Sequence, residues 1–487
     1  MSEVAVNKEV PEGWVSVPLE DCAEILDSRR IPLNSKERSV RIEGKSQDQL
    51  YPYYGATGQV GFIDDFIFEG EHLLIGEDGA PFFDKSKNVA YIANAKFWVN
   101  NHAHILNALK GVTTNKYLLH YLNNFNYKDF VGGTTRLKLN QRDLKKIPVP
   151  LAPPEQQKRI VAKIEELFSH IDAGIEALKK AKQLLKQYRQ SVLKVAVTGE
   201  LTKEWREARI KDDAHGSANV AGGRKPGATK LEPASQLLER ILKERRQKWE
   251  EQQLEQFKVK GKIPKDDKWK EKYKEAIEFE SSIDIPKEWI GVTSDQVFYY
   301  VTSGSRGWAK YYSEEGSIFL RMGNLEHYDV RIDLKDIQRV SPPEGAEGSR
   351  TKVKPGDSLI SITADVGMVG IVPDDFEEAY INQHVSLARP VIRLMGLYLA
   401  WLLSGDFAKE QFKALQRGAT KVGLGLDDIR AIQFGLPSLE EQEEIVRLIE
   451  EKLSSIEHLD TELDQQLVKA EKNKQSILAS AFSGRIN

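Results

Sequence analysis

The chain has 487 residues, of which 40% are hydrophobic and 29% are charged, and its formal net charge at pH 7 is −3. This length exceeds what one hydrophobic core supports and predicts several domains. The sequence has no apolar run long enough to span a bilayer, and its only cysteine, Cys22, excludes disulfides and thiolate metal clusters. We therefore expect a cytoplasmic protein in which any nucleic-acid binding depends on local basic surfaces.

Residues 1–146 are expected to form a first domain made mainly of strands and turns. The segment Gly55-Ala56-Thr57-Gly58 is typical of a turn, residues 60–68 and 73–75 of strands, and residues 116–125 of a short amphipathic helix. Basic side chains gather in its expected loops, where arginine could bind guanine edges and phosphates. They are Arg29, Arg30, Lys36, Arg38, Arg41, Arg136, Lys138, Arg142, Lys145 and Lys146.

Residues 147–201 predict a first long helix, which Pro153-Pro154 would open and Gly199 would end. Its apolar residues recur at steps of three, four or seven, which is typical of a heptad seam that needs a partner helix. They are Ile160, Ile164, Leu167, Ile171, Leu178, Leu185, Val192 and Val195.

Residues 202–285 are expected to be a connector. The Gly- and Ala-rich stretch from His215 to Thr229 is typical of a flexible loop, residues 233–258 of a helix, and residues 260–274 of an exposed lysine-rich segment. A solvated connector is the favoured interpretation, and a phosphate- or partner-binding role is the alternative.

Residues 286–432 predict a second domain, with strands at 317–321 and 358–363 and a helix at 397–403. Residues 433–487 predict a second long helix, which a capping box of Ser438 and Glu441 would begin and Gly484 would end. Its seam residues are Ile445, Ile449, Ile456, Leu459, Leu463, Ala470 and Ile477.

The two long helices are copies of one another. Leu151 matches Leu436, Ser191 matches Ser476 and Gly199 matches Gly484, each pair 285 positions apart. The domains share fainter echoes, such as Asn100-Asn101-His102 with Asn382-Gln383-His384. This internal repeat predicts an α+β fold in which two strand-rich domains are separated by two helices packed as an antiparallel coiled coil about 65 Å long.

No motif indicates that the chain is itself an enzyme. It lacks a phosphate-binding loop that ends in Gly-Lys-Ser/Thr and a glycine-rich turn for a dinucleotide or a methyl donor, so no cofactor is expected. Residues 76–79 and the pair His102 and His104 could suggest a metal site. Without cysteine or nearby acidic partners we expect hydrogen bonding instead. Residues 373–378 favour an acidic surface turn over a nuclease cluster.

Nearly the whole chain resembles the specificity subunit of type I restriction-modification systems. The resemblance depends on YPYYGATGQVGFID and GEHLLIGEDGAP in the first domain, and on TSGSRGW and GDSLISITADVGMVGI in the second. It depends also on the two helix openings, PLAPPEQQKRIVAKIEELFSHID and PSLEEQEEIVRLIEEKLSSIE, and on the connector ASQLLERILKERRQKW.

The resemblance implies a non-catalytic reader of double-stranded DNA. Each domain would be a target recognition domain for one half of a bipartite, asymmetric site. The helices would set the spacer and dock two methylation subunits and, through them, two restriction subunits. Those partners would carry the adenine methyltransferase and the ATP-dependent endonuclease activities.

Loop position and side-chain chemistry, without a family motif, select the candidate DNA contacts. They are Arg29, Arg30, Thr57, Arg136, Lys138, Arg306, Thr363, Gln383, Thr420 and Lys421. Two alternatives stay open: the recognition subunit of a fused methyltransferase–nuclease system, which co-purification would separate from a type I subunit, and a coiled-coil adaptor that binds no DNA.

Overall fold

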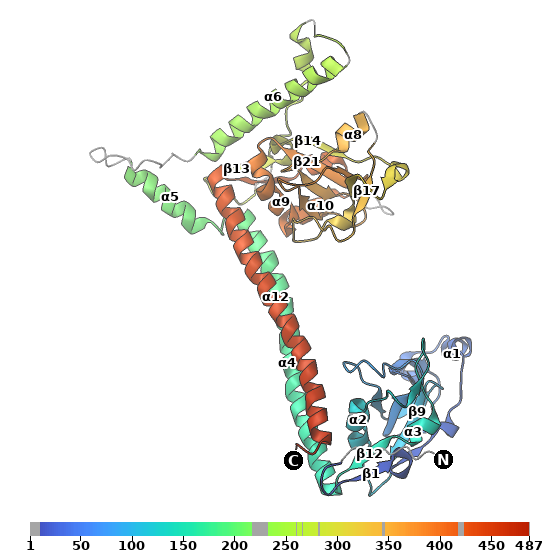
Figure 1. Ribbon diagram of the computed structural model, residues 1–487. Helices are drawn as coiled ribbons and strands as arrows, with labels where there is room; N and C mark the ends of the chain where they lie inside the picture. The colour runs from blue at the N-terminus through green and yellow to red at the C-terminus, as the bar shows by residue number, and fades with distance from the viewer. Residues whose placement is uncertain are drawn as a thin grey trace. The chain divides into compact units, whose positions relative to one another are not determined.

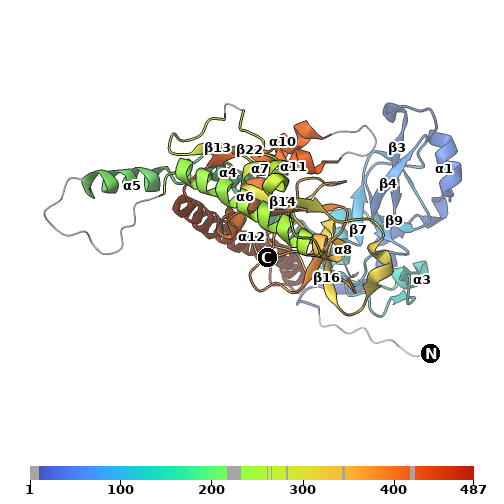
Figure 2. The same ribbon diagram turned by 90° about the horizontal axis from the view of Figure 1, so that it is seen from above.

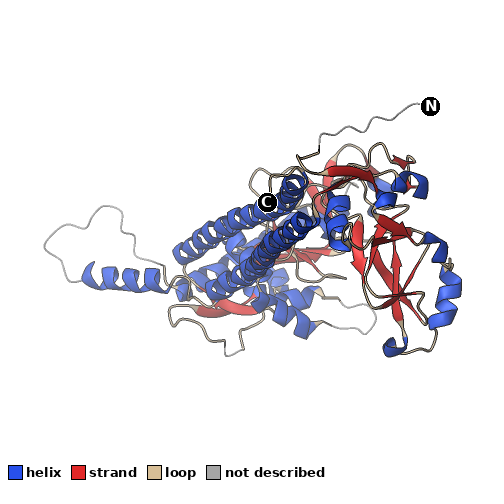
Figure 3. Ribbon diagram, turned by 90° about the horizontal axis from the view of Figure 1, so that it is seen from below, coloured by secondary structure: helices blue, strands red, loops and turns tan. Residues whose placement is uncertain are grey.

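The computed structural model describes residues 10–216, 232–259, 261–264, 266–280, 283–342, 346–416 and 423–486. The chain divides into two compact units, which we call unit 1 (Met1–Lys182 and Thr461–Asn487) and unit 2 (Gln183–Asp460). Each unit joins a strand-rich domain to parts of both long helices, α4 (Pro154–Val197) and α12 (Leu439–Phe482) (Figure 3). The predicted α+β class is thus confirmed. Within the described residues, no helix has the length and apolar content of a membrane span.

Unit 1 contains two four-stranded sheets. One is antiparallel in the order β2-β9-β6-β7, and the other has the order β4-β3-β8-β5 with a parallel pair β3–β8. Helix α2 (Asn115–Asn124), as predicted, packs on β6, β7 and β9, and the short α3 (Gln141–Lys145) precedes β12. The strands are β1 (Val15–Pro18), β2 (Ala23–Ile25), β3 (Tyr51–Gly55), β4 (Gly58–Ile63), β5 (Phe68–Glu69), β6 (His72–Gly76), β7 (Ala90–Ala93), β8 (Lys96–Val99), β9 (Ala103–Ala108), β10 (Val131–Gly132), β11 (Lys138–Leu139) and β12 (Pro148–Leu151).

Two local predictions in unit 1 are wrong. Part of the expected early basic loop is the helix α1 (Ser35–Ile42), which Asn34 and Glu37 begin with a reciprocal capping box. The strand expected at 60–68 is two strands, β4 and β5. The chain turns between them where Asp64 forms ion pairs with Arg41, at 2.6 Å, and with Lys45, at 2.5 Å.

Unit 2 repeats this plan. Its antiparallel sheet has the order β14-β21-β18-β19, its second sheet β15-β17-β16-β20 has a parallel pair β16–β20, and α9 (Gly396–Ser404) packs on β18 and β19. The strands are β13 (Ile290–Thr293), β14 (Phe298–Ser303), β15 (Tyr312–Ser313), β16 (Ser317–Leu320), β17 (Gln338–Val340), β18 (Ser358–Ser361), β19 (Val369–Ile371), β20 (Ala379–Ile381), β21 (Val385–Pro390) and β22 (Gln433–Leu436). The other helices are α5 (Lys203–Gly216), α6 (Ala234–Val259), α7 (Ser294–Val297), α8 (Ala346–Thr351), α10 (Asp406–Leu415) and α11 (Leu426–Arg430).

Within unit 1, the first part of α4 and the last part of α12 lie side by side and run antiparallel (Figure 1). Asp172 pairs with Lys474 at 2.5 Å and Lys182 with Asp464 at 2.6 Å, so one residue number rises by ten as the other falls by ten. In unit 2, Arg189 of α4 pairs with Glu457 of α12 at 3.2 Å. The predicted antiparallel pairing is confirmed.

The predicted seam holds with one exception. Ile160, Ile164 and Val192 of α4 are buried, as are Ile445, Ile449 and Ile456 of α12, but Leu459 is 46% exposed. Counted in steps of seven, the seam passes from Ile456 to Leu463 and leaves Leu459 facing solvent.

The start of α12 differs in part from the predicted capping box. The N–H of Glu441 does donate to Ser438 Oγ, at 3.2 Å, but the buried Glu441 carboxylate serves the connector and the second domain instead. It accepts hydrogen bonds from Thr202 Oγ1 at 2.7 Å, from Trp289 Nε1 at 3.0 Å and from Arg206. Residues distant in sequence therefore take the carboxylate half of the predicted capping box, and the Ser438 half is formed as predicted.

Each helix ends inside the domain of the other repeat. Gly199, after α4, has φ 78° and lies so close to Pro286 that a Cβ would come within 2.4 Å of the ring. Gly484, after α12, has φ 73° and approaches Pro11 in the same way. Both positions need glycine, as predicted. The core of unit 1 includes Leu478, Ala481 and Phe482, and that of unit 2 includes Leu193, Ala196 and Val197.

The connector is more than a solvated link. Helix α6, predicted at 233–258, crosses beside β14 (Figure 2) and buries Leu237 and Ile241 in the core of unit 2. Its Arg245 donates to Asp295 at 3.2 Å and to Tyr273 Oη at 2.7 Å. Of the flexible loop predicted at 215–229, residues 215 and 216 end α5 and residues 217–229 lie outside the described residues.

Candidate nucleic-acid interface

The two units build the same turn from the Asn-X-His echo. The N–H of His102 donates to Asn100 Oδ1 at 2.8 Å, and the N–H of His384 donates to Asn382 Oδ1 at 3.0 Å. The turn leads into β9 in unit 1 and into β21 in unit 2. It fixes the backbone at the histidine, and the middle residue of the motif differs between the units, Asn101 in unit 1 and Gln383 in unit 2.

The histidine ring then contacts the loop after the central strand. His102 Nδ1 lies 2.7 Å from Asp78 after β6, and His384 Nδ1 lies 2.6 Å from Thr363 Oγ1 after β18. Asp78 also forms a ladder bridge with Lys138, and Thr363 forms the equivalent bridge with Gly423. Three chain segments therefore meet at one place in each unit, with a shared frame and different polar groups.

In unit 1 this junction carries a charged cluster. Arg30 donates to Glu77 Oε2 at 2.6 Å and to the carbonyl of Ala103 at 3.0 Å, and Lys138 lies 3.2 Å from Glu77 Oε1. Arg136, on the outer side, pairs with Asp78 at 2.7 Å. The cluster ties the loop after β2 to the loops beside β6 and β11.

Below the cluster lies a buried acid–imidazole pair. Asp27 Oδ2 is 2.5 Å from His104 Nδ1, and His104 Nε2 donates to the carbonyl of Leu139 at 2.8 Å. Asp27 also accepts from the N–H of Ile105 at 3.0 Å and from Gln141 Nε2 at 3.0 Å. Burial alone would raise the pKa of the Asp27 carboxyl, but the hydrogen bond with His104 and the charges of His104 and Arg30 lower it below its ordinary value.

Asp27, Glu77 and His104 offer oxygen and nitrogen atoms within 4.8 Å of one another, a grouping that could hold a metal ion. The sequence argument against a metal, that no acidic partner lies near these histidines, is therefore wrong. The geometry still assigns hydrogen bonding to His104, because both ring nitrogens already face protein oxygens. Arg30 and Lys138 also balance the two carboxylates.

A polar groove of about 590 Å³ opens beside His102 in unit 1. Asn34, Arg38, Tyr53, Asn100 and Asn101 are among its lining residues. The Arg38 guanidinium stacks over the Tyr53 ring at 4.9 Å. A groove lined by amides, an aromatic ring and an arginine offers the donors and acceptors that base edges and phosphates require.

The predicted contact residues of unit 1 fall into two groups. Arg29, Thr57 and Arg136 are exposed, with Thr57 at the tip of the β3–β4 hairpin and Arg29 stacked over Phe68 at 5.0 Å. Lys138 is half-exposed beside Glu77. The Arg30 side chain is only 15% exposed and donates hydrogen bonds to oxygens of Asp27, Glu77 and Ala103. Arg30 is therefore better suited to positioning the loops than to contacting a base.

In unit 2, Arg306 is exposed and forms no hydrogen bond or ion pair with the residues that the structure describes. Thr363 and Gln383 both contact His384, the amide of Gln383 at 2.9 Å from Nε2, so the junction brings these two together. Thr420 and Lys421 lie outside the described residues.

Sequence reasoning missed Asn101. It occupies the middle of the Asn-X-His turn, is exposed, and lines the polar groove. Its equivalent Gln383 is among the predicted contacts, so the internal repeat contains the signal that points to Asn101. In the sequence Arg38 is one of several basic residues, and only the fold of α1 places it in the groove.

Comparison with known proteins shows the family. A family model described as the type I restriction modification DNA specificity domain matches residues 11–185 and 344–467, more than half of the chain. The specificity subunit of the EcoBI type I restriction enzyme of Escherichia coli is 23% identical, over 98% of this chain and 87% of its own. That of StySPI from Salmonella potsdam is 21% identical, over 98% and 90%.

A putative type I specificity subunit of Haemophilus influenzae is 36% identical over 150 residues, which cover 31% of this chain and 36% of that protein. A chain solved in work on complex assembly and conformational transition of a type I restriction-modification system has a TM-score of 0.57 at 16% identity, over 98% of this chain and 99% of its own, and so shares the fold. With its duplicated junctions and this match across both halves, the chain belongs to the type I restriction-modification DNA specificity family.

Proposed function

We propose that this chain is the DNA-recognition subunit of a type I restriction-modification complex. Residues 1–146 and 286–432 act as two target recognition domains, each for one half of a bipartite, asymmetric DNA site. The observation that carries the proposal is the duplicated junction. One frame holds the pairs Asp78–His102 and Thr363–His384, with different polar groups around them.

The candidate contacts are polar and basic residues in the loops of the two domains. They are Arg29, Thr57, Asn101, Arg136 and Lys138 in the first domain and Arg306, Thr363, Gln383, Thr420 and Lys421 in the second. Arginine and amide side chains suit base edges, whereas lysine suits phosphates. Arg30 is assigned a positioning role.

The chain is not itself the catalyst in this proposal. Two methylation subunits methylate adenine, two restriction subunits supply ATP-dependent cleavage, and α4 and α12 set the spacer and dock the methylation subunits in the cytoplasm. The purified chain with DNA and a methyl donor should give no methylation, and the assembled complex should give it.

A domain exchange tests the division of labour. Residues 10–147 from a relative with a different target are grafted into this chain, which is co-expressed with its methylation subunits. Sequencing of methylated adenines should show a change in one half-site only, and the reciprocal graft of residues 285–432 should change the other half. A change in both halves after either graft would contradict the proposal.

A further inference from the structure

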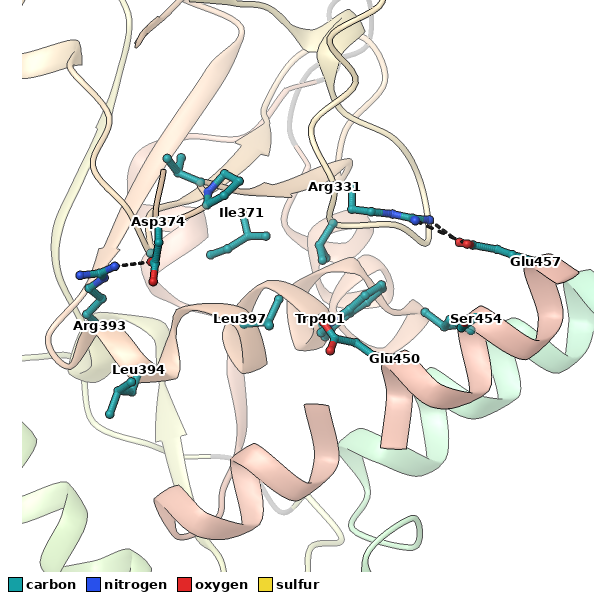
Figure 4. Close-up of a pocket in the computed structure, with 15 residues that line it drawn as sticks. Arg331, Ile371, Asp374, Arg393, Leu394, Leu397, Trp401, Glu450, Ser454 and Glu457 are labelled. Carbon is teal, nitrogen blue, oxygen red and sulfur yellow. Dashed lines mark hydrogen bonds and ion pairs between the residues drawn. The ribbon is translucent and has the colours of Figure 1, made fainter. Parts of the chain in front are cut away.

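Unit 2 contains an apolar groove of about 990 Å³ that the proposed DNA contacts do not use (Figure 4). It lies between α9, the chain that follows β19, and the first half of α12. Ile371, Leu397, Trp401 and Leu453 supply apolar surface, and Leu394 at the edge is 72% exposed. Ion pairs of Arg331 with Glu457 and of Arg393 with Asp374 lie at its sides. Apolar surface framed by charges is typical of a protein-binding site.

The internal repeat shows what is special about this groove. Tyr117 of α2 and Tyr398 of α9 are equivalent, because they donate to the carbonyls of Pro150 and Gly435 at matching places in β12 and β22. The residue before the tyrosine is Lys116 in unit 1 and Leu397 in unit 2. Lys116 pairs with Glu165 of α4 at 2.7 Å, whereas Leu397 has no charge to offer Glu450, the α12 equivalent of Glu165.

The next helical turn differs as well. The residue three positions after the tyrosine is His120 in unit 1 and Trp401 in unit 2. The facing residue of the long helix is Phe168 of α4 in unit 1 and its equivalent, Leu453 of α12, in unit 2. Phe168 packs edge-on against His120 at 5.8 Å. In unit 2 the larger Trp401 takes the place of His120 and the smaller Leu453 that of Phe168, so this place is lined by different apolar side chains in the two units.

Two polar groups in the groove have no partner among the described residues. Glu450 is exposed and forms no hydrogen bond or ion pair, and the Trp401 Nε1–H is buried without an acceptor. A buried donor without an acceptor costs about 1–3 kcal/mol. The indole N–H lies beneath the surface, out of reach of a docked segment, so the exposed Glu450 carboxylate is the group that calls for a partner, a cation beside an apolar side chain.

We propose that this groove docks a segment of a methylation subunit. The segment inserts an apolar side chain between Leu397 and Leu453 and pairs a lysine or arginine with Glu450. Because unit 1 has Lys116 and Phe168 at the equivalent places, the two units hold their methylation subunits by unlike contacts. The inference rests on the proposed function and adds to it one surface and the chemistry of its occupant.

Binding of the full-length chain to its methylation subunit, measured by isothermal titration calorimetry, tests the groove. Glu450→Arg should raise Kd about tenfold because it repels the cation. The control Glu443→Arg makes the same charge change on an exposed residue of α12 outside the groove and should leave Kd unchanged. Circular dichroism checks that each variant is folded.

A photo-crosslinker gives the second readout. With p-benzoylphenylalanine in place of Leu394, irradiation of the complex should join the chain to the methylation subunit. Wild-type Kd for Glu450→Arg, or a crosslink only between two copies of this chain, would overturn the groove assignment. If the wild-type chain itself failed to bind the methylation subunit, the proposed function would fail instead.

Discussion

His104 Nδ1 and Asp27 Oδ2 lie 2.5 Å apart in the interior of unit 1, and no such pair stands at the matching place in unit 2. There Ser386 Oγ donates to the carbonyl of Thr302 at 3.1 Å, so a neutral contact joins the equivalent strands β14 and β21. At this position, therefore, unit 1 has a buried charged pair and unit 2 has a neutral hydrogen bond.

Replacement of Asp27 by Asn should destabilise unit 1 by roughly 3 kcal/mol, because it leaves His104 with a weaker partner in a buried place. The pKa of Asp27 lies below its ordinary value of 3.8, so the pair contributes stability above about pH 4 and loses it as the pH falls further. Hydrogen exchange of the Ile105 amide, which donates to Asp27, measures the change locally. Wild-type protection in Asp27→Asn at pH 7 would show that the pair contributes little.

His120 should set a second and higher acid limit for unit 1. Burial lowers its pKa from 6.5 to about 4, so the folded state resists its protonation. Stability is fully present above about pH 6.5 and should fall by roughly 2 kcal/mol by pH 5. His120→Phe keeps the ring against Phe168 and should remove most of this loss in urea unfolding at pH 7 and pH 5. The exposed His170→Gln serves as the control, and an equal pH dependence in wild type and His120→Phe would contradict the assignment.

Lengthening both helices tests the spacer. Inserting a single helical turn near Leu185 in α4 alone would rotate the apolar seam of α4 away from that of α12. We therefore insert one heptad after Leu178 in α4 and one heptad after Val468 in α12. In unit 1 both points lie between the ion pairs Asp172–Lys474 and Lys182–Asp464. The insertion adds about 10 Å of helix and should lengthen the unread spacer by roughly 3 base pairs. If methylation mapping of the lengthened variant shows the wild-type spacer, the helices do not set the spacer length.

Asn101 and Gln383 provide a matched pair of specificity variants. Asn101→Ala should relax one position of the first half-site by about 1–3 kcal/mol, and Gln383→Ala should relax one position of the second. Binding of DNA panels that vary one base at a time measures both. A uniform loss of affinity across all sequences would instead indicate contacts with phosphates.

Much of the fold could be predicted because its signals are local or repeated. The heptads, the helix-ending residues Gly199 and Gly484 and the 285-residue offset are visible in the sequence. Errors arose where long-range partners override local pattern. The Glu441 carboxylate binds Arg206 and Trp289 and does not complete the capping box, and Leu459 is apolar yet lies off the seam.

The candidate interface was harder to predict. Asp27 and His104 are 77 positions apart, and nothing in either neighbourhood indicates that they meet. Arg30 has the chemistry of a base reader, and only its contacts with Glu77 and Ala103 reveal a positioning role. Asn101 was within reach of prediction through its repeat partner Gln383.

Because each long helix ends in the core of the other repeat's domain, the chain has a preferred order of folding. Phe482 packs edge-on against Tyr117 and Tyr121, each at 5.3 Å, so the first domain to leave the ribosome waits for some 300 further residues before its core can close. All of unit 2 lies between residues 183 and 460, so the later domain can complete its core first. During that interval the apolar surface around Tyr117 and Tyr121 is open, which makes nascent unit 1 the part of the chain most exposed to chaperones and to misassembly.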